Sequence, residues 1–529
     1  MKNVEWKWLF VLSLAGRSGW RYARLLVLFS VFSFGSLRAV ADDSGKGERT
    51  GKKGSDRSRP NVIYILADDL GYGDVGCLNP EGKIATPYID RFASQGMTFT
   101  DAHSGSSVCT PTRYGVMTGR YAWRTRLQHG VIRFGDPLIE NDRMTVASLF
   151  KENGYHTQGI GKWHVGQKYE WPSSEPDQPK TIVRSDYEKL PPGTKLLEGP
   201  ADRGFDSYFW FLIYIIPNDR REWATIHDDV VKETLSQEAL LPELTRRGVE
   251  HIHKRADVYK NDGTPFFMYW APPVPHTPIA PSGKWVGSSE INNSYADYVQ
   301  QFDWSVGRLF QALDDAGIAD NTLVVLTSDN GCTPGLGIFE SLRKKGHAAS
   351  GIYRGAKADI WDGGHRVPFF ARWPKRIEAG SKNEGLVCLT DFMATAADLL
   401  RTDLPENTGE DSFSMLPTLL GKKKKTRKSV VHHSIEGRFA IREGKWKLIF
   451  CPGSGGWAYP KDGKARELGW PEVQLYDMEK DPQEATNVQA QYPAVVKRLT
   501  KLMKEVIADG KSRPKAKGEN EVPIVLYKK

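Results

Sequence analysis

Short apolar runs that end abruptly in polar residues constrain the fold of this chain more than any other feature. The residues Asn61–Ala67 (NVIYILA) form an almost uninterrupted apolar run that is followed at once by Asp68 and Asp69. Comparable runs occupy Thr157–Gly161, Pro265–Trp270 and Thr322–Thr327. Continuous apolar runs of this length are typical of strands that are buried on both faces, as in a parallel sheet.

Helical patterns separate these runs, at Thr86–Gly96 and again at Tyr295–Ala316. Strands that alternate with helices predict an α/β fold with a large, mostly parallel mixed sheet flanked by helices. Ligands bind such sheets beyond the carboxyl ends of the strands. The charged residues that directly follow the apolar runs are therefore the first candidates for a functional site.

A lysine run at Lys422–Lys425 indicates a domain boundary. Beyond it, the patterns are a hairpin-like alternation at Phe439–Phe450, a short strand at Gln474–Tyr476 and an amphipathic segment at Pro493–Ala508. They predict a catalytic domain over residues 60–421 and a smaller C-terminal α+β subdomain with a tail over residues 422–529.

The first 41 residues have the features of an export signal. Scattered Lys and Arg residues precede an apolar run at Leu25–Phe34, and Ala39-Val40-Ala41 provides a small-residue cleavage site. We expect cleavage after Ala41, a disordered linker over residues 42–59, and an exported protein that is periplasmic or secreted. An uncleaved membrane anchor is the alternative, but the apolar run is shorter than the ~20 residues that a span requires, so we expect no stable membrane association.

The formal charge of +9 at pH 7 does not predict a nucleic-acid-binding protein. The basic residues gather in the leader, in the linker Ser44–Arg59 and at Lys422–Lys428, and the last two stretches lack interleaved aromatic residues. The five cysteines are an odd number at no regular spacing, which argues against a disulfide framework and against a CxxC metal site.

The most specific motif is Cys109-Thr110-Pro111-Thr112-Arg113, which is followed by Thr118-Gly119-Arg120. Pro111 can open a helix whose first turn carries Arg113, with Cys109 just before it, where free backbone N–H groups face an anion. A buried structural thiol beside an ordinary helix start is the alternative. The motif resembles the C-x-P-[ST]-R…T-G-R signature of the sulfatases, the arylsulfatase-type, formylglycine-dependent hydrolases of the alkaline phosphatase-like superfamily.

This resemblance implies that Cys109 is oxidised to Cα-formylglycine by a formylglycine-generating enzyme or an equivalent. It also implies a C-terminal four-stranded sheet with a helix, which agrees with the patterns beyond Lys425. One segment departs from the family: Trp210–Pro217 (WFLIYIIP) is strongly apolar where many sulfatases have a Gly- or Ser-containing substrate loop.

Four oxygen-bearing side chains follow two of the predicted strands, Asp68 and Asp69 after one and Asp329 and Asn330 after another. Such ligands suit Ca²⁺ or Mg²⁺, although Asp-Asp and Asp-Asn-Gly are also common in turns and caps. The resemblance implies that these four residues bind one Ca²⁺, together with the group formed at Cys109.

Three further motifs supply cations and imidazoles. Lys162 and His164 stand two apart in Gly161-Lys162-Trp163-His164, so both would point to one face of an extended segment. His276 lies between two prolines in Pro275-His276-Thr277-Pro278, which argues against a core packing role, and Lys357 ends Arg354-Gly355-Ala356-Lys357. The alternatives are that Lys162 is a surface residue beside a His164 whose hydrogen bonds are already made, and that Lys357 is a solvated surface charge.

The resemblance implies a role for each of these residues. Lys162 would hold a sulfate oxygen and His164 would act on the formylglycine hydroxyl, while His276 and Lys357 would serve the leaving group. Arg113 would offset developing charge. In the segment Gly363–Pro368, we give Arg366 a structural role and His365 no firm role.

The expected function is hydrolysis of sulfate monoesters, with a sulfated carbohydrate as substrate, by a formylglycine hydrate derived from Cys109 with help from Ca²⁺. A sulfate monoester requires charge neutralisation and an in-line nucleophile, as phosphoryl transfer does. One alternative is a formylglycine-dependent phosphonate monoester or phosphodiester hydrolase. Another is a catalytically silent sulfated-glycan binder.

Overall fold

The computed structural model describes residues 59–132, 135–170, 193–211, 222–228 and 230–528. The predicted export signal and nearly all of the linker lie outside these residues, as do residues 212–217 of the apolar segment that departs from the family. Among the helices of the described residues, none is long and apolar enough to span a membrane.

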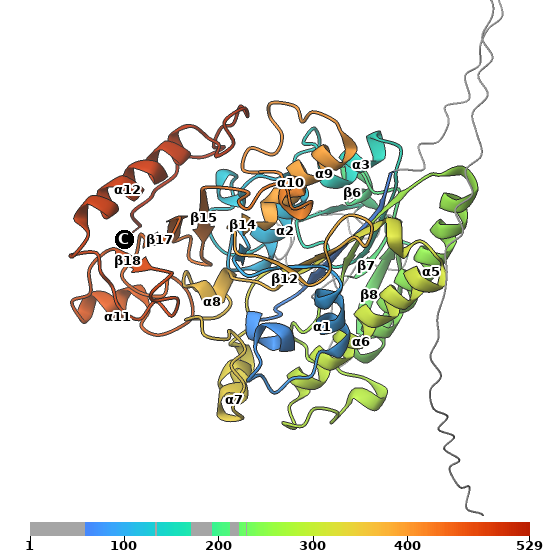
Figure 1. Cartoon of the computed structure of the whole chain (residues 1–529), viewed down its shortest axis with the longest axis horizontal. Coiled ribbons are helices and arrows are strands. Elements are labelled where there is room, and N and C mark those ends of the chain that lie inside the picture. Colours follow the sequence, from blue (N-terminus) through green and yellow to red (C-terminus); the bar gives the residue numbers. More distant parts are fainter. Residues whose placement is uncertain (1–58, 133–134, 171–192, 212–221, 229, 529) are drawn as a thin grey trace, which may run out of the picture. The chain divides into compact units, whose positions relative to one another are not determined.

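A ten-stranded mixed sheet runs through the larger part of the chain (Figure 1). In spatial order its strands are β13 (Ser381–Asn383), β2 (Met97–Phe99), β12 (Phe369–Arg372), β11 (Thr322–Ser328), β1 (Asn61–Ala67), β10 (Phe266–Ala271), β4 (His156–Gly161), β7 (Ser207–Phe211), β8 (Glu222–His227) and β9 (Val230–Ser236). The five consecutive strands from β11 to β7 are parallel to one another. The predicted α/β fold is confirmed, and the four strands predicted from apolar runs form four adjacent members of the sheet.

Helices cover both faces of this sheet, and alternate residues of β1 point into the two resulting cores. Ile63, Ile65 and Ala67 pack with α1 (Pro87–Ser94), α5 (Gln237–Asp262) and α6 (Ser294–Asp315). Val62, Tyr64 and Leu66 pack in a second core with α2 (Cys109–Thr118), α3 (Val146–Glu152), α9 (Phe392–Leu400) and α10 (Leu416–Leu419). A strand that is buried on both faces has no polar side to show, which explains the continuous apolar runs.

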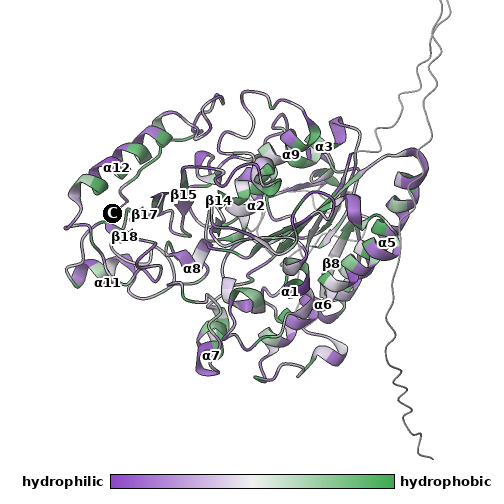
Figure 2. Ribbon diagram, in the orientation of Figure 1, coloured by the Kyte–Doolittle hydropathy of each residue, from purple (hydrophilic) through white to green (hydrophobic). Residues whose placement is uncertain are grey.

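A separate four-stranded antiparallel sheet lies in the C-terminal part, in the order β15 (Ser429–His433), β16 (Phe439–Glu443), β17 (Trp446–Ile449) and β18 (Gln474–Asp477). Helix α12 (Pro493–Ala508) packs against it through Leu499, Met503 and Val506. The hydropathy colours show that α12, α5 and α6 each carry hydrophobic and hydrophilic residues, as helices with one buried side do (Figure 2). The predicted C-terminal α+β arrangement is confirmed, while the boundary at residues 421 and 422 stays a prediction.

The remaining elements are short. They are the strand pair β3 (Ala102–His103) and β14 (Val387–Cys388), the strand pair β5 (Lys168–Tyr169) and β6 (Leu196–Glu198), and the helices α7 (Ile338–Lys344), α8 (Asp362–His365) and α11 (Asp462–Glu467).

Candidate active site

The predicted site residues converge at the carboxyl ends of adjacent parallel strands. Asp329 and Asn330 follow β11, Asp68 and Asp69 follow β1, Lys162 follows β4, and the loop with His276 follows β10. Because β11, β1, β10 and β4 are neighbours in that order, their carboxyl ends lie side by side. This is the edge at which ligands bind in open α/β sheets.

Four of these side chains bring oxygen atoms into one fully buried cluster. The backbone N–H of Asp69 donates to Asp329 Oδ1 at 3.2 Å, and Asn330 Nδ2 donates to Asp69 Oδ1 at 2.7 Å. Three oxygens, Asp68 Oδ1, Asp69 Oδ2 and Asn330 Oδ1, are buried without a hydrogen-bond partner. Buried polar atoms are rarely left unpaired, and carboxylate and amide oxygens are the ligands of hard cations. The chemistry of this donor set therefore fits a hard cation such as Ca²⁺.

Three cations surround this acidic cluster. Lys162 Nζ lies 2.6 Å from Asp68 Oδ2, and Lys357 Nζ lies 2.6 Å from Asp69 Oδ1. The guanidinium of Arg113 donates twice to Asp329 Oδ2, from Nε at 3.0 Å and from a terminal nitrogen at 2.7 Å. All six side chains are almost completely shielded from solvent, so these ion pairs act in a medium of low dielectric constant.

Burial and the ion pairs compete in setting the pKa values here. Burial alone would raise the pKa of Asp68, but Lys162, His276 and Arg113 hold it well below its usual range. Burial and the neighbouring Asp68 raise the pKa of Asp329 to about 7 against the opposing effect of Arg113. Burial alone would lower the pKa of Lys357, yet Asp69 more than offsets this and the ammonium stays protonated.

Cys109 lies at the first position of α2 and is only 3% exposed. The prediction that it precedes the helix is wrong by a short distance: α2 begins at Cys109, and Pro111 is its third residue. The first helical N–H groups have no acceptor within the helix, so a proline is tolerated throughout the first turn and does not fix where the helix starts. Burial raises the pKa of the Cys109 thiol, although Lys162 and Lys357 oppose the shift, so the unmodified side chain is a neutral thiol.

The prediction of an extended segment at Lys162 and His164 is also wrong. Strand β4 ends at Gly161, where a Cβ atom would lie 2.2 Å from the carbonyl oxygen of Ala271, and His164 has a left-handed φ of 61°. The backbone at His164 is therefore not extended. Both ring nitrogens of His164 are buried without a partner, and burial, followed by Lys162 and Arg113, lowers its pKa well below the usual value. A neutral imidazole with unpaired nitrogens is thus aimed into the cation-rich cluster.

His276 lies on the more open side of the site. Its Nδ1 is 2.5 Å from the carbonyl oxygen of Thr277, so this nitrogen carries the proton and donates it, while Nε2 is 3.8 Å from Asp69 Oδ2. Burial and the charge of Lys357 lower the pKa of His276. Cys109, Arg113, Lys162, His164, His276 and Lys357 are thus brought together around the four oxygen-bearing residues.

Sequence reasoning missed Tyr269, whose hydroxyl lies 3.5 Å from a terminal nitrogen of Arg113. Its position inside the buried strand β10 conceals it, and the only signal is a polar atom within an otherwise apolar run. Arg366 pairs at 3.0 Å with both Asp101 and Asp362, which agrees with a structural role. His365 lies in a separate buried group with His103 and His432.

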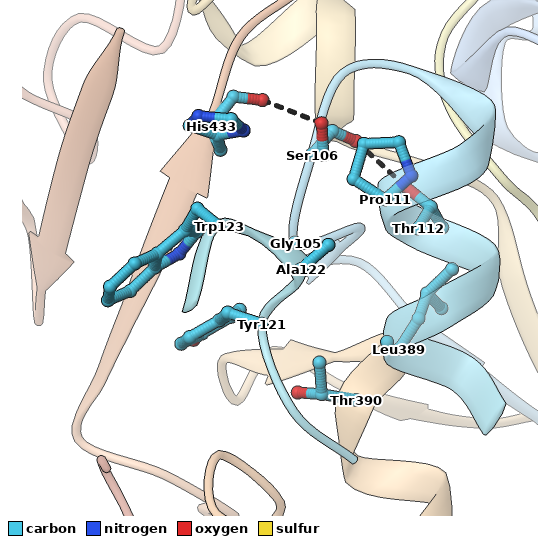
Figure 3. A pocket seen from close by; sticks show the side chains of 11 residues that line it. Gly105, Ser106, Pro111, Thr112, Tyr121, Ala122, Trp123, Leu389, Thr390 and His433 are labelled. Atoms are coloured by element: carbon cyan, nitrogen blue, oxygen red, sulfur yellow. Dashed lines mark hydrogen bonds between the residues drawn. The ribbon is translucent and has the colours of Figure 1, made fainter. Parts of the chain in front are cut away.

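The C-terminal sheet fixes the segment that leads into Cys109. Ser106 Oγ donates to the carbonyl oxygen of His433 at 2.8 Å, and Thr112 Oγ1 donates to the carbonyl oxygen of Ser106 at 3.1 Å. These two bonds are drawn in Figure 3, where the side chains of Pro111 and Trp123 line a small cavity between α2 and β15. None of the candidate site residues lines this cavity, so it belongs to the scaffold.

Comparison with known proteins agrees with this geometry. Residues 60–402 match the family "Sulfatase", and residues 356–509 match "N-sulphoglucosamine sulphohydrolase, C-terminal". The chain is 32% identical to the N-acetylgalactosamine-6-O-sulfatase of Bacteroides thetaiotaomicron, over 89% of this chain and 98% of the relative. It is 33% identical to human Arylsulfatase A, over 81% of this chain and 83% of the relative.

A solved Bacteroides thetaiotaomicron sulfatase, described with the metabolism of multiple glycosaminoglycans, has a similar fold. It superposes with a TM-score of 0.72 at 28% identity and covers 85% of this chain and 99% of its own. A family match over more than half of the chain, a relative of similar length and a shared fold all lead to one assignment. The chain belongs to the sulfatase family and is a sulfuric ester hydrolase.

Proposed function

We propose that this enzyme hydrolyses sulfate monoesters of a sulfated carbohydrate, with Cys109 converted to formylglycine and one Ca²⁺ bound beside it. The observation that carries the proposal is the cluster of unpaired buried oxygens flanked by Arg113, Lys162 and Lys357 around the first residue of α2. The name of the N-acetylgalactosamine-6-O-sulfatase relative, which spans nearly the same length, favours a carbohydrate.

The residues that would hold Ca²⁺ are Asp68, Asp69, Asp329 and Asn330, together with the group formed at Cys109. Their carboxylate and amide oxygens fit this hard cation, and three of those oxygens have no hydrogen-bond partner. Bound Ca²⁺ would supply a Lewis acid that orients the sulfate and favours ionisation of the attacking hydroxyl.

Burial raises the pKa of the Cys109 thiol, so the unmodified side chain would be a weak nucleophile. Conversion to formylglycine would replace it with a group that can attack sulfur. The hydrated aldehyde of formylglycine supplies one hydroxyl that attacks sulfur and a second that allows sulfate to be expelled as the aldehyde re-forms. A formylglycine-generating enzyme or an equivalent is the required partner.

The surrounding side chains bind the anion and move protons. The permanent charge of Arg113 and the ammonium groups of Lys162 and Lys357 offset charge that develops on the sulfate oxygens. Lys357, whose ammonium stays protonated beside Asp69, is the proton donor for the leaving oxygen, and His276 lies next to it with Nε2 3.8 Å from Asp69 Oδ2. His164, whose ring nitrogens have no other partner, is available to take a proton from the formylglycine hydroxyl.

Export and domain organisation belong to the same proposal. We propose that the signal is cleaved after Ala41 and that the protein is periplasmic or secreted, with the catalytic domain over residues 60–421 and the C-terminal subdomain over residues 422–529. N-terminal sequencing of the protein from its native host tests the cleavage site directly.

Peptide mass spectrometry across Ser104–Arg113 of the active protein tests the central step. Conversion of the Cys109 thiol to the activated aldehyde lowers the mass of this peptide by about 18 Da. An unmodified thiol in active enzyme would refute the formylglycine mechanism. Faster turnover of phosphonate monoesters or phosphodiesters than of sulfate monoesters would replace the proposed substrate class, and sulfated-glycan binding with a free thiol and no turnover would identify a silent binder.

A further inference from the structure

The loop over residues 450–461, which joins β17 to α11, presents two exposed aromatic side chains. Trp457 is 44% exposed and Tyr459 is 71% exposed, although aromatic residues of this size are usually much more buried. Two exposed aromatic side chains so close in one loop are candidates for an interaction site.

Hydrogen bonds within the loop and to the first residue of α11 fix its conformation. Ser454 donates from its backbone N–H to the carbonyl oxygen of Pro460 at 3.0 Å and from Oγ to that of Ala458 at 2.7 Å. Asp462 Oδ1 accepts the backbone N–H groups of Gly453 and Gly455 at 3.2 and 3.3 Å. A ligand that contacts Trp457 or Tyr459 would therefore not have to order the loop first.

The loop is held directly against the segment that follows Lys357. Asp359 Oδ1 accepts the backbone N–H groups of Trp457 and Ala458, both at 2.9 Å. Gly456 packs so tightly on Ala358 that a Cβ atom would lie 2.3 Å from the carbonyl oxygen of Ala358. The backbone of Trp457 is thus bound to Asp359, which lies two residues along the chain from Lys357, the residue whose ammonium contacts Asp69.

The candidate active site is nearly closed to solvent. Cys109 is 3% exposed and Lys357 is 5% exposed, so only the reacting end of a large substrate can lie among these residues. The rest of a carbohydrate chain must lie on the surface outside these residues. The aromatic loop is an exposed apolar surface whose backbone is bound through Asp359 to the segment that carries Lys357.

We propose that Trp457, with Tyr459 beside it, binds the sugar unit next to the sulfated one, with the apolar C–H face of that sugar stacked on the indole ring. This inference rests on the proposed carbohydrate substrate and adds that recognition extends beyond the sulfated unit. Indole offers the largest flat apolar area among side chains together with a polar N–H group, which suits a sugar that has both kinds of surface.

The test compares two substrates in the matured enzyme. The probes are N-acetylgalactosamine 6-sulfate and a trisaccharide that ends in the same sulfated unit, and the readout is the ratio of their kcat/KM values. Trp457→Ala is expected to lower the trisaccharide-to-monosaccharide ratio roughly tenfold, mainly through the KM of the trisaccharide, whereas Trp457→Phe keeps most of it. The melting temperature of each variant verifies that it is folded.

Tyr492→Ala is the matched control. Tyr492 is 42% exposed and packs on Trp446, at the opposite end of β17 from the aromatic loop, and its replacement leaves the ratio unchanged. A ratio that stays the same in Trp457→Ala overturns the proposed sugar contact alone. A wild-type enzyme that hydrolyses an aryl sulfate but neither sugar substrate overturns the proposed substrate class, and the sugar contact with it.

Discussion

Calcium should control the stability of this protein as well as its activity, and Asn330→Ala tests this most sharply. Each unpaired buried oxygen costs about 1–3 kcal/mol, so the three oxygens of the cluster together cost about 3–9 kcal/mol that a bound cation would offset. With free calcium at a hundredfold excess over Kd, binding adds about 2.7 kcal/mol to the free energy of unfolding. Asn330→Ala removes one of the three oxygens, and we expect the calcium affinity to fall at least about tenfold.

The assay is equilibrium unfolding in EDTA and across a calcium titration. At a calcium concentration that is a hundredfold above the wild-type Kd, Asn330→Ala should gain about 1.4 kcal/mol less from calcium than the wild type does. Asn61→Ala is the matched control, because Asn61 is equally buried but lies at the amino end of β1, where its Oδ1 accepts the N–H of Phe266 at 3.1 Å. Its loss of stability should be the same with and without calcium.

Two results would refute this reasoning. One is a wild-type protein that unfolds at the same denaturant concentration in EDTA and in calcium. The other is an Asn330→Ala variant whose calcium response matches that of the wild type, which would remove Asn330 from the metal site and leave its unpaired oxygen without a role.

Three further predictions use other parts of the molecule. Cys109→Ala should abolish turnover and leave the melting temperature within a few degrees of wild type, and ordinary turnover in that variant would rule out formylglycine. Lys447→Met should lower the free energy of unfolding by about 3–5 kcal/mol, because the buried Lys447 ammonium lies 2.8 Å from both Asp362 and Glu484; a denaturation midpoint equal to wild type would contradict this. Burial raises the pKa of Asp303 to about 7, so the folded protein keeps a proton that the unfolded chain releases near about pH 4. The free energy of unfolding should therefore fall as the pH rises between these two values. Asp303→Asn should remove a total pH-dependent change of roughly 4 kcal/mol over that range, and an unchanged profile would show that Asp303 is ionised.

The central strands and the residues that follow them could be predicted because both depend on local pattern. An uninterrupted apolar run such as Asn61–Ala67 requires burial on both faces, and its end is visible in the sequence as Asp68. Parallel pairing then places the ends of different strands together, whatever the distance between them in the chain. This is why Asp68 and Asp329 could be assigned to one site although 261 residues separate them.

The other features of the site depend on contacts that leave no local pattern. Neither the close packing of Gly161 on Ala271 in the neighbouring strand nor the left-handed backbone of His164 can be read from the motif itself. The aromatic loop reaches the site through Asp359, which lies 98 residues before Trp457 in the sequence. Neither end of that contact has a pattern that identifies the other.

The same long-range contacts show why the C-terminal sheet belongs to the active site and is more than an appended unit. The backbone N–H of Ser107, two residues before Cys109, donates to the carbonyl oxygen of His433 in β15 at 3.0 Å. Ala358, the residue after Lys357, donates to the carbonyl oxygen of Ser107 at 2.8 Å and accepts from the N–H of Ile435 at 3.2 Å.

These bonds hold the segments that carry Cys109 and Lys357 against each other and against the chain that follows β15. The large sheet positions the acidic cluster, since Asp68 and Asp329 extend directly from its strands. Among the described residues, no strand of the large sheet hydrogen-bonds to the backbone of Ser107 or Ala358. Strand β15 and the residues after it make these hydrogen bonds instead. The position of Cys109 relative to Lys357 therefore depends on residues from both sheets.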